Sequence, residues 1–197
     1  MPGVVVLGAR NLGGAIVDRF DEPLAVSSPV DTVWVNPPEF AEAGDGIALY
    51  LRNDIAYFEA AFGAGMLGIY PVPVNWHYTQ DEANYLLTDS AVKLLLIHSD
   101  LYEPIKQAIP AGLQVVIVET PPEIRAAYAH SETPQPEGLP RWHELVNAAA
   151  PFSGEAEMAP STIIYTSGTT GRPKGVRRAA FTPEQAEAVN TMLGWSY

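Results

Sequence analysis

The chain has 197 residues, of which 47% are hydrophobic and 10% aromatic; this is enough for one sizeable packed domain and excludes disorder throughout. Its 11 basic and 23 acidic residues give a net charge of -12, which excludes a broad nucleic-acid-binding or anionic-membrane surface, because both need a positive field. There is no cysteine, which excludes disulfides and thiolate metal sites, so we expect a cytoplasmic protein.

Short apolar runs alternate with amphipathic segments, a pattern typical of an α/β fold with a mostly parallel sheet layered with helices. Residues 120–140, rich in proline and charge, are predicted to form a surface excursion. We divide the chain into an N-terminal segment, 1–46, and an α/β portion, 47–197. In chain order, the expected strands are 47–51, 69–74, 92–97, 114–118 and 161–166, and the expected helices are 54–66, 79–89, 102–108, 142–149 and 183–192.

Local signals mark the ends of several of these elements. Asn53 is the predicted cap of the first helix. Thr79 and Glu82 have the spacing of a capping box, in which each side chain bonds the other residue's backbone amide, and Thr182 and Gln185 repeat that spacing.

Two kinds of feature are expected to be absent. The most apolar stretch, 60–74, is interrupted by glycines and prolines, so no transmembrane segment is expected; prolines within 69–74 also predict an edge strand. The histidines have no ligand-like spacing, so we expect no metal site and predict ordinary surface or partly buried side chains for His77, His98, His130 and His143.

A glycine-rich loop follows the last expected strand. Its glycines allow close backbone approach, its hydroxyls can donate hydrogen bonds and its lysine supplies an ammonium, which together suit a polyphosphate. Four of the 11 basic residues lie in a window of seven around it: Arg172, Lys174, Arg177 and Arg178. Because the loop begins where a strand ends, we expect it at the carboxyl edge of the sheet, where open α/β sheets bind ligands. The candidate binding residues are Thr166, Ser167, Gly168, Thr169, Thr170, Gly171 and Lys174.

Three other interpretations of the glycines compete with this one. A solvated surface turn would leave the concentration of positive charge in an acidic protein unexplained. The nucleoside-triphosphatase loop requires Gly-Lys-Ser/Thr five residues after its first glycine, and this spacing is not met. The segment from Gly8 to Gly14 follows an apolar run, but it lacks a clean Gly-x-Gly-x-x-Gly, so a turn without ligand is favoured there over dinucleotide binding.

The stretch from Tyr165 to Val176 resembles the signature of the AMP-binding, adenylate-forming superfamily of acyl-CoA synthetases, peptide-synthetase adenylation domains and luciferases. An upstream region resembles the same family in order and spacing: Phe62 to Gly68, Pro71 to Asn75, Glu82, and Tyr85 to Ser90. The resemblance covers roughly 47–176. It implies an incomplete N-terminal domain of an adenylate-forming enzyme, which in this family precedes a small mobile C-terminal domain.

The resemblance also implies an activity, that of an AMP-forming acyl-CoA ligase. A carboxylic acid, with a fatty, steroid-like or aromatic acyl group, reacts with Mg-ATP to give acyl-AMP and pyrophosphate, and the acyl group then passes to coenzyme A. By position, Thr166 to Gly171 and Lys174 would hold the β- and γ-phosphates, with Lys174 and Thr166 as the catalytic residues. Ala180 stands where many relatives have a histidine, so the resemblance implies nothing about acyl gating.

Family members are considerably longer, so we expect a truncated chain that is inactive alone. Two other functions stay open: a stand-alone module that binds a nucleotide or a protein partner, and, less favoured, a dinucleotide-binding protein. Whether the protein forms a homo-oligomer is also open, as is the role of Arg177 and Arg178, which either contact phosphate or only solvate the edge of the loop.

Overall fold

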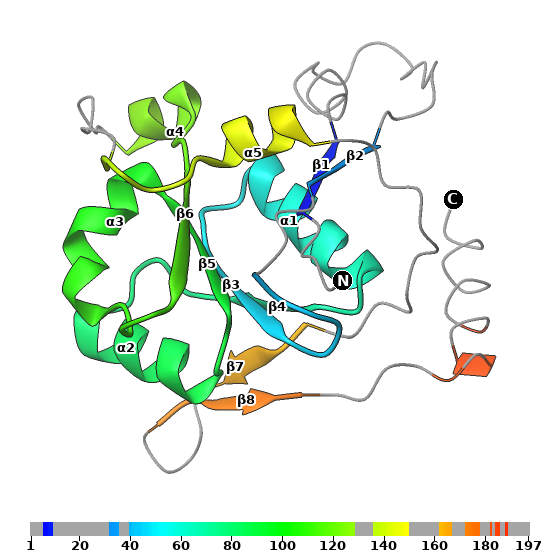
Figure 1. Cartoon of the computed structure of the whole chain (residues 1–197). Helices are drawn as coiled ribbons and strands as arrows, with labels where there is room; N and C mark the ends of the chain where they lie inside the picture. Colours follow the sequence, from blue (N-terminus) through cyan, green and yellow to red (C-terminus); the bar gives the residue numbers. More distant parts are fainter. Residues whose placement is uncertain are drawn as a thin grey trace, which may run out of the picture.

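The computed structural model describes residues 6–9, 32–35, 40–128, 136–149, 162–166, 172–177, 182, 184–185 and 188. The central element is a four-stranded parallel sheet with the strand order β4-β3-β5-β6 (Figure 1). Its strands are β3 (Gly46–Tyr50), β4 (Tyr70–Pro73), β5 (Leu94–His98) and β6 (Gln114–Val118). The α/β class and the parallel sheet predicted from the sequence are therefore confirmed.

The two prolines of β4 explain its place at the edge of the sheet. Tyr70 and Val74 direct their backbone N–H groups to β3, with N–O distances of 2.8 Å to Asp45 and 3.0 Å to Leu49. Successive residues of a strand alternate in direction, so Pro71 and Pro73 occupy positions whose N–H would point away from β3. Since proline has no N–H, this outer edge carries fewer donors, and its Pro71 carbonyl accepts the Ile163 N–H (3.0 Å) from the segment that leads into β7.

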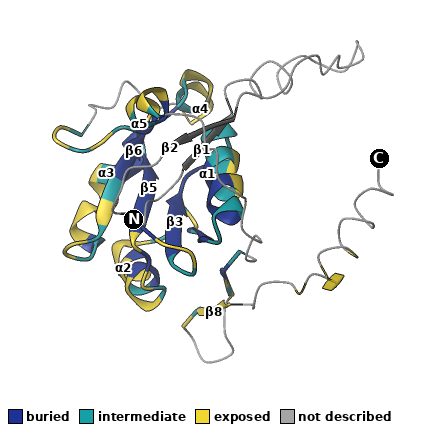
Figure 2. Ribbon diagram, turned by 45° about the vertical axis from the view of Figure 1, so that its right-hand side comes forward, coloured by how far each residue is buried: buried dark blue, intermediate teal, exposed yellow. Residues whose placement is uncertain are grey.

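Helices cover both faces of the sheet and bury two separate apolar clusters. On one face, α1 (Ile55–Met66) and α5 (Trp142–Ala148) pack on side chains such as Leu49 and Leu96. On the other face, α2 (Gln80–Asp89), α3 (Ser99–Ile105) and the short η1 (Lys106–Ala108) pack on side chains such as Leu95 and Ile97. A helix α4 (Pro122–Ala127) has no buried residue. Every residue of β3 and β5 is buried, as expected for central strands of a layered sheet (Figure 2).

Several helix ends differ from those predicted. The cap of α1 is Asp54 and not Asn53, because the Asp54 carboxylate accepts both the Tyr57 backbone N–H (2.9 Å) and the imidazole of His98 (2.9 Å). The helix predicted from residue 102 begins at Ser99. Both predicted capping boxes are confirmed: Thr79–Glu82 has both of its bonds, and the reciprocal Thr182–Gln185 bonds are 2.9 and 3.3 Å long.

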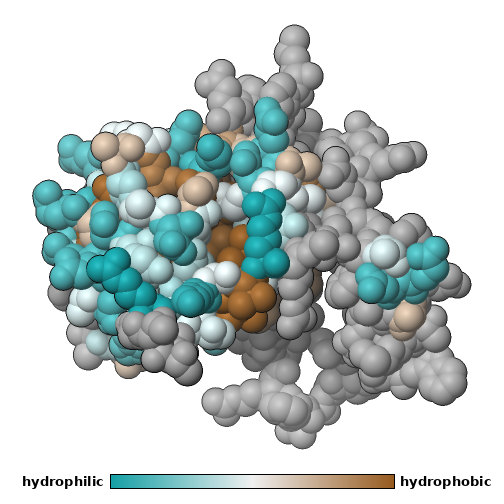
Figure 3. All heavy atoms as spheres, turned by 90° about the horizontal axis from the view of Figure 1, so that it is seen from below, coloured by the Kyte–Doolittle hydropathy of each residue, from teal (hydrophilic) through white to brown (hydrophobic). Residues whose placement is uncertain are grey.

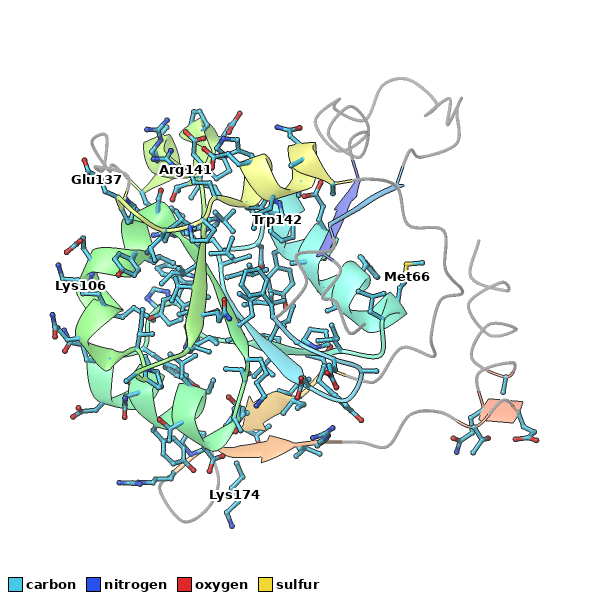
Figure 4. The ribbon with its side chains drawn as sticks, viewed as in Figure 1. Met66, Lys106, Glu137, Arg141, Trp142 and Lys174 are labelled. Atoms are coloured by element: carbon cyan, nitrogen blue, oxygen red, sulfur yellow. The ribbon has the colours of Figure 1, made fainter. Side chains whose placement is uncertain are left out.

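The predicted surface excursion, 120–140, is only partly correct. It contains α4, and it begins with Thr120, which is buried and hydrogen-bonded rather than exposed. At its other end the Pro140 carbonyl accepts the Ile117 N–H (2.9 Å), and Arg141 bridges to β6. Trp142 then inserts between α5 and α1, where its indole N–H meets the Glu59 carboxylate at 3.4 Å (Figure 4).

Two antiparallel pairs of strands lie outside the parallel sheet. Strands β1 (Val6–Ala9) and β2 (Thr32–Val35) pair with each other. A dinucleotide-binding unit opens with a strand of a parallel sheet, so the antiparallel pairing of β1 counts against that alternative. Strands β7 (Ile164–Thr166) and β8 (Lys174–Val176) form the other pair, a hairpin that is mostly exposed (Figure 2). The helix predicted over 183–192 lies mostly outside the described residues.

Candidate functional site

The β7–β8 hairpin brings the two predicted catalytic residues together. Thr166 is the last residue of β7, Lys174 is the first of β8, and the two are direct partners in the strand register. Their side chains are exposed, and Figure 4 shows Lys174 extending from β8 away from the rest of the domain. Paired residues in an antiparallel ladder have Cα atoms about 4.5–5.5 Å apart, so the side chains of Thr166 and Lys174 leave the backbone next to each other, one at each end of the loop.

The loop that this pair closes is the predicted phosphate-binding segment. Its residues Ser167, Gly168, Thr169, Thr170 and Gly171 lie outside the described part of the chain. Their assignment therefore stays a prediction.

The Lys174 ammonium has no competing partner among the described residues. No hydrogen bond or ion pair within that part of the chain involves its Nζ atom. An exposed lysine keeps its charge and can turn it toward an anion, because its long side chain rotates freely. The net charge of -12 makes this local cation a preferred position for an anionic ligand on an otherwise acidic protein.

The two described arginines beside Lys174 are held on aromatic rings of the helical layer and the sheet. The Arg172 guanidinium lies over the Tyr85 ring, 5.1 Å from its centroid. The Arg177 guanidinium lies over the Tyr70 ring at 4.2 Å and donates to the Gly44 carbonyl. Arg177 therefore ties the end of β8 to the sheet and does more than solvate the loop, whereas Arg178 lies outside the described residues.

The hairpin lies at the amino edge of the parallel sheet, and this corrects the expectation of a carboxyl-edge site. Arg177 reaches Gly44 and Tyr70, which lie just before β3 and at the start of β4. Tyr165 bonds Asp89, the last residue of α2, which leads into β5. The loop does follow a strand, but that strand belongs to the hairpin and not to the parallel sheet. Figure 3, viewed from below, shows this side of the described surface as mainly hydrophilic, with a small apolar area in its middle.

Both ends of the loop are fastened to α2. The Tyr165 hydroxyl donates to the Asp89 carboxylate (2.7 Å), and the Tyr85 hydroxyl donates to the Pro173 carbonyl (3.0 Å). Tyr85 to Ser90, one part of the upstream match to the family, and Tyr165 to Val176, the signature match, therefore meet here in space. The sequence analysis assigned neither Tyr85 nor Asp89 a role, although their i, i+4 spacing on a capped helix was visible.

The carboxyl edge of the sheet is closed by a buried polar network that the sequence analysis missed. All of the buried polar residues of the described part of the chain lie there: Arg52, His98, Ser99 and Thr120. The Arg52 guanidinium forms a two-bond pair with Asp100, at 2.9 Å (Nη1–Oδ1) and 2.7 Å (Nη2–Oδ2). Its central carbon lies 4.8 Å from the centroid of the Trp76 ring and 4.7 Å from that of the Tyr128 ring, and these two rings pack edge-to-face against each other.

His98 is fully buried, which corrects the expectation of a surface or partly buried side chain. Its Nδ1 atom accepts the Arg52 backbone N–H (3.2 Å), so its Nε2 atom carries the proton and donates to Asp54 (2.9 Å). Both ring nitrogens are thereby used within the protein, and neither is available to a ligand. A signal was present in the sequence, because Arg52, His98 and Thr120 each follow or end an apolar strand.

Asp100 stays ionised within this network. Burial acts to raise its pKa, but hydrogen bonds from Arg52 and Thr120 and the charge of Arg52 outweigh burial and leave the pKa below the usual aspartate value of 3.8. Thr120 donates to the same carboxylate at 2.6 Å. The network therefore bonds mainly within itself, although the buried Nε atom of Arg52 has no hydrogen-bond partner among the described residues.

The fold and the hairpin together define the N-terminal domain of an adenylate-forming enzyme. The sequence profile of the family "AMP-binding enzyme" matches residues 41–181, and the chain belongs to this family. The match begins before β3 and ends beyond β8, so it includes the parallel sheet and the hairpin.

Individual relatives agree with this assignment. The chain is 30% identical over 194 residues to 4-hydroxybutyrate–CoA ligase 2 of Metallosphaera sedula, covering 91% of this chain and 34% of that protein. It is 33% identical over 134 residues to the fatty acid–[acyl-carrier-protein] ligase ScoC of Streptomyces coeruleorubidus, covering 68% and 23%. The crystal structure of the anthranilate CoA ligase AuaEII with anthranoyl-AMP is similar with a TM-score of 0.55, 25% identity, and coverage of 71% and 26%.

The chain spans about a quarter to a third of the length of these relatives. Among the described helices, none is both long and apolar enough to cross a bilayer. The described residues also contain no group of three or more His, Asp or Glu side chains suited to hold a metal ion.

Proposed function

We propose that this chain is the N-terminal part of an AMP-forming acyl-CoA ligase and that its β7–β8 hairpin binds the terminal phosphates of ATP. The observation that carries the proposal is the pairing of Thr166 with Lys174, with an exposed ammonium that no described residue engages. Family membership and the similarity to CoA and carrier-protein ligases support it. Between the two residues lies the segment 167–171, whose glycines and hydroxyls suit phosphate oxygens.

The proposed reaction has two steps. A carboxylate oxygen attacks the α-phosphorus of ATP, the bond from that phosphorus to the bridging oxygen breaks, and pyrophosphate leaves with the electron pair. A thiolate then attacks the acyl carbonyl carbon and AMP leaves. Magnesium enters with ATP as part of the substrate.

The role of this chain lies in the first step. Negative charge on the departing pyrophosphate increases as the bond breaks, so an ammonium held near it stabilises the transition state more than the ground state. Lys174 supplies that charge, and Thr166 supplies a hydroxyl donor at the opposite strand. Neither residue is a nucleophile or a proton carrier in this scheme.

The substrates follow from the family and are part of the proposal. The acid is a carboxylic acid with a fatty, steroid-like or aromatic acyl group, and the thiol is coenzyme A. The names of the relatives give two thiols that accept the acyl group, coenzyme A and an acyl-carrier protein, and the assay should compare them. The cytoplasm supplies ATP and coenzyme A, and we place the activity there.

Lys174→Ala tests the proposal in the complete gene product, assayed by carboxylate-dependent exchange of labelled pyrophosphate into ATP over a panel of acids. We expect exchange to fall about 10²-fold or more, as when one charge-stabilising donor is removed from a polar active site. Lys106→Ala, which removes an exposed lysine on the far side of α2, is the matched control and should leave exchange unchanged. Equal exchange in Lys174→Ala and wild type would remove Lys174 from the mechanism.

The alternative of a stand-alone nucleotide-binding module predicts a different result in the same assay. Such a protein would bind Mg-ATP with saturation, measured by calorimetry, and would show no exchange with any acid. Binding would still weaken in Lys174→Ala.

A further inference from the structure

One face of α2 holds both ends of the proposed phosphate loop. Tyr85 and Asp89 are four residues apart on this helix and therefore lie on the same side, one turn from each other. Asp89 accepts the hydroxyl of Tyr165, just before the loop, and Tyr85 donates to the carbonyl of Pro173, just after it. Seven residues, 166–172, lie between the two fastened points.

The helix that provides these two groups is itself firmly held. Its first turn has a complete capping box, and its inner side chains Ala83, Leu86 and Leu87 are buried against the sheet. The Asn84 amide also donates to the Ala108 carbonyl (2.8 Å), which ties α2 to η1. Groups on such an element keep their positions, whereas a two-stranded hairpin is marginally stable by itself.

A glycine on the facing strand leaves the space that the Tyr165 ring occupies when it bonds Asp89. Gly175 is its register partner, and a Cβ atom added at Gly175 would lie 2.7 Å from the Cε2 and Cζ atoms of the Tyr165 ring. The ring thus lies directly across the backbone of β8, with its hydroxyl directed at Asp89. Burial raises the pKa of Tyr165, and the bond to Asp89 raises it further, so the phenol remains a neutral donor.

We propose that Tyr85 and Asp89 are positioning residues that set the geometry of the phosphate loop for adenylation. The inference rests on the proposed function above. The bonds they make lie near the surface, since Asp89 is exposed and Tyr85 and Tyr165 are half-buried, and only the Tyr165 ring packs against the apolar cluster beneath α2. Their main effect is therefore on the placement of Thr166 and Lys174, and small misplacements of catalytic groups cost far more in rate than in stability.

Tyr165→Phe and Asp89→Ala test the proposal in the complete gene product, because each removes the bond at the front of the loop. We expect kcat for pyrophosphate exchange to fall about 10-fold and KM for Mg-ATP to rise, since the donors no longer meet the phosphates in one geometry. The melting temperature should shift by less than about 4 °C, the size expected for one lost surface bond. Asp89→Asn keeps an oxygen that can accept from Tyr165, and it should restore most of the rate.

Gln80→Ala is the matched control. It removes another exposed side-chain bond of α2, from Gln80 to the Pro104 carbonyl (2.9 Å), at the end of the helix far from the hairpin. It should match wild type in exchange. A second readout is hydrogen exchange of the backbone amides of Arg172 and of 174–176, which should accelerate in Tyr165→Phe and Asp89→Ala but not in Gln80→Ala.

The outcomes separate this inference from the function on which it rests. Wild type without carboxylate-dependent exchange would overturn the proposed function. Active wild type with Tyr165→Phe and Asp89→Ala equal to Gln80→Ala in both kcat and amide exchange would overturn the positioning role alone. A loss of rate that Asp89→Asn fails to restore, together with a large drop in melting temperature, would also overturn it, because α2 would then be needed only for folding.

Discussion

The two edges of the parallel sheet use charge in opposite ways. At the carboxyl edge, Arg52 and Asp100 are 4% and 3% exposed, and they pair with each other by two bonds. At the amino edge, Lys174 is exposed and has no partner among the described residues. A buried charge must be paired to be tolerated, so it holds structure together, whereas an exposed unpaired charge keeps its capacity to bind an anion.

This contrast places the candidate ligand site. The usual binding edge of an open parallel sheet is its carboxyl edge, but here the groups that meet there satisfy one another. The nitrogens of His98 are both bonded, and the guanidinium of Arg52 lies against two aromatic rings that also contact each other. The amino edge receives a hairpin from a later part of the chain, and the hairpin brings the residues that we propose bind phosphate.

The largest effect is expected when the Arg52–Asp100 pair at the carboxyl edge of the sheet is broken. Arg52→Ala leaves the Asp100 carboxylate buried without its cation, so the free energy of unfolding should fall by about 3–5 kcal/mol, measured by chemical denaturation. Lys106→Ala removes an exposed ion pair with Glu103 (2.6 Å) and should leave the free energy of unfolding nearly unchanged, because solvent screens such a pair. Equal losses of unfolding free energy in the two variants would show that the carboxyl-edge network stabilises the fold no more than an exposed ion pair does.

A smaller loss of stability is expected from a substitution in the hairpin at the amino edge of the sheet. Gly175→Ala places a methyl group against the Tyr165 ring, which must move and give up its bond to Asp89. The expected loss of stability is about 1 kcal/mol, the worth of one hydrogen bond, while pyrophosphate exchange should fall as in Tyr165→Phe. In a Tyr165→Ala background the ring is gone, so adding Gly175→Ala should change neither quantity further; a full additional loss would mean that Gly175 acts independently of Tyr165.

The smallest expected effect is a change in how stability depends on pH below pH 5, and it concerns Asp100. Its folded-state pKa lies below the usual value of 3.8, so its contribution to stability is complete above that value and is lost as the pH falls through the folded pKa. Unfolding free energies measured between pH 5 and pH 2 should fall less steeply in Asp100→Asn than in wild type. Should that variant not fold, an NMR titration of the Asp100 carboxyl in wild type gives the same answer, and a midpoint above 3.8 would contradict the prediction.

Features governed by near neighbours in the chain were predictable. The capping boxes at Thr79 and Thr182 depend on residues three positions apart, and both formed. The edge position of β4 was predicted from its prolines. The cap of α1 was predicted one residue too early, because Asp54 is selected by His98, a residue 44 positions away that local sequence does not reveal.

The sequence by itself determined the α/β class, the order of the elements and the chemistry of the candidate site. The periodicity of strands and helices, the helix caps and the glycine-rich loop all depend on residues that are close together in the sequence. Only the tertiary structure decided where that chemistry lies. The pairing of Arg52 with Asp100 and of Tyr165 with Asp89 joins residues 48 and 76 positions apart. Such contacts depend on how the layers pack, and they close one edge of the sheet, whereas Lys174 at the other edge has no partner within the described part of the chain.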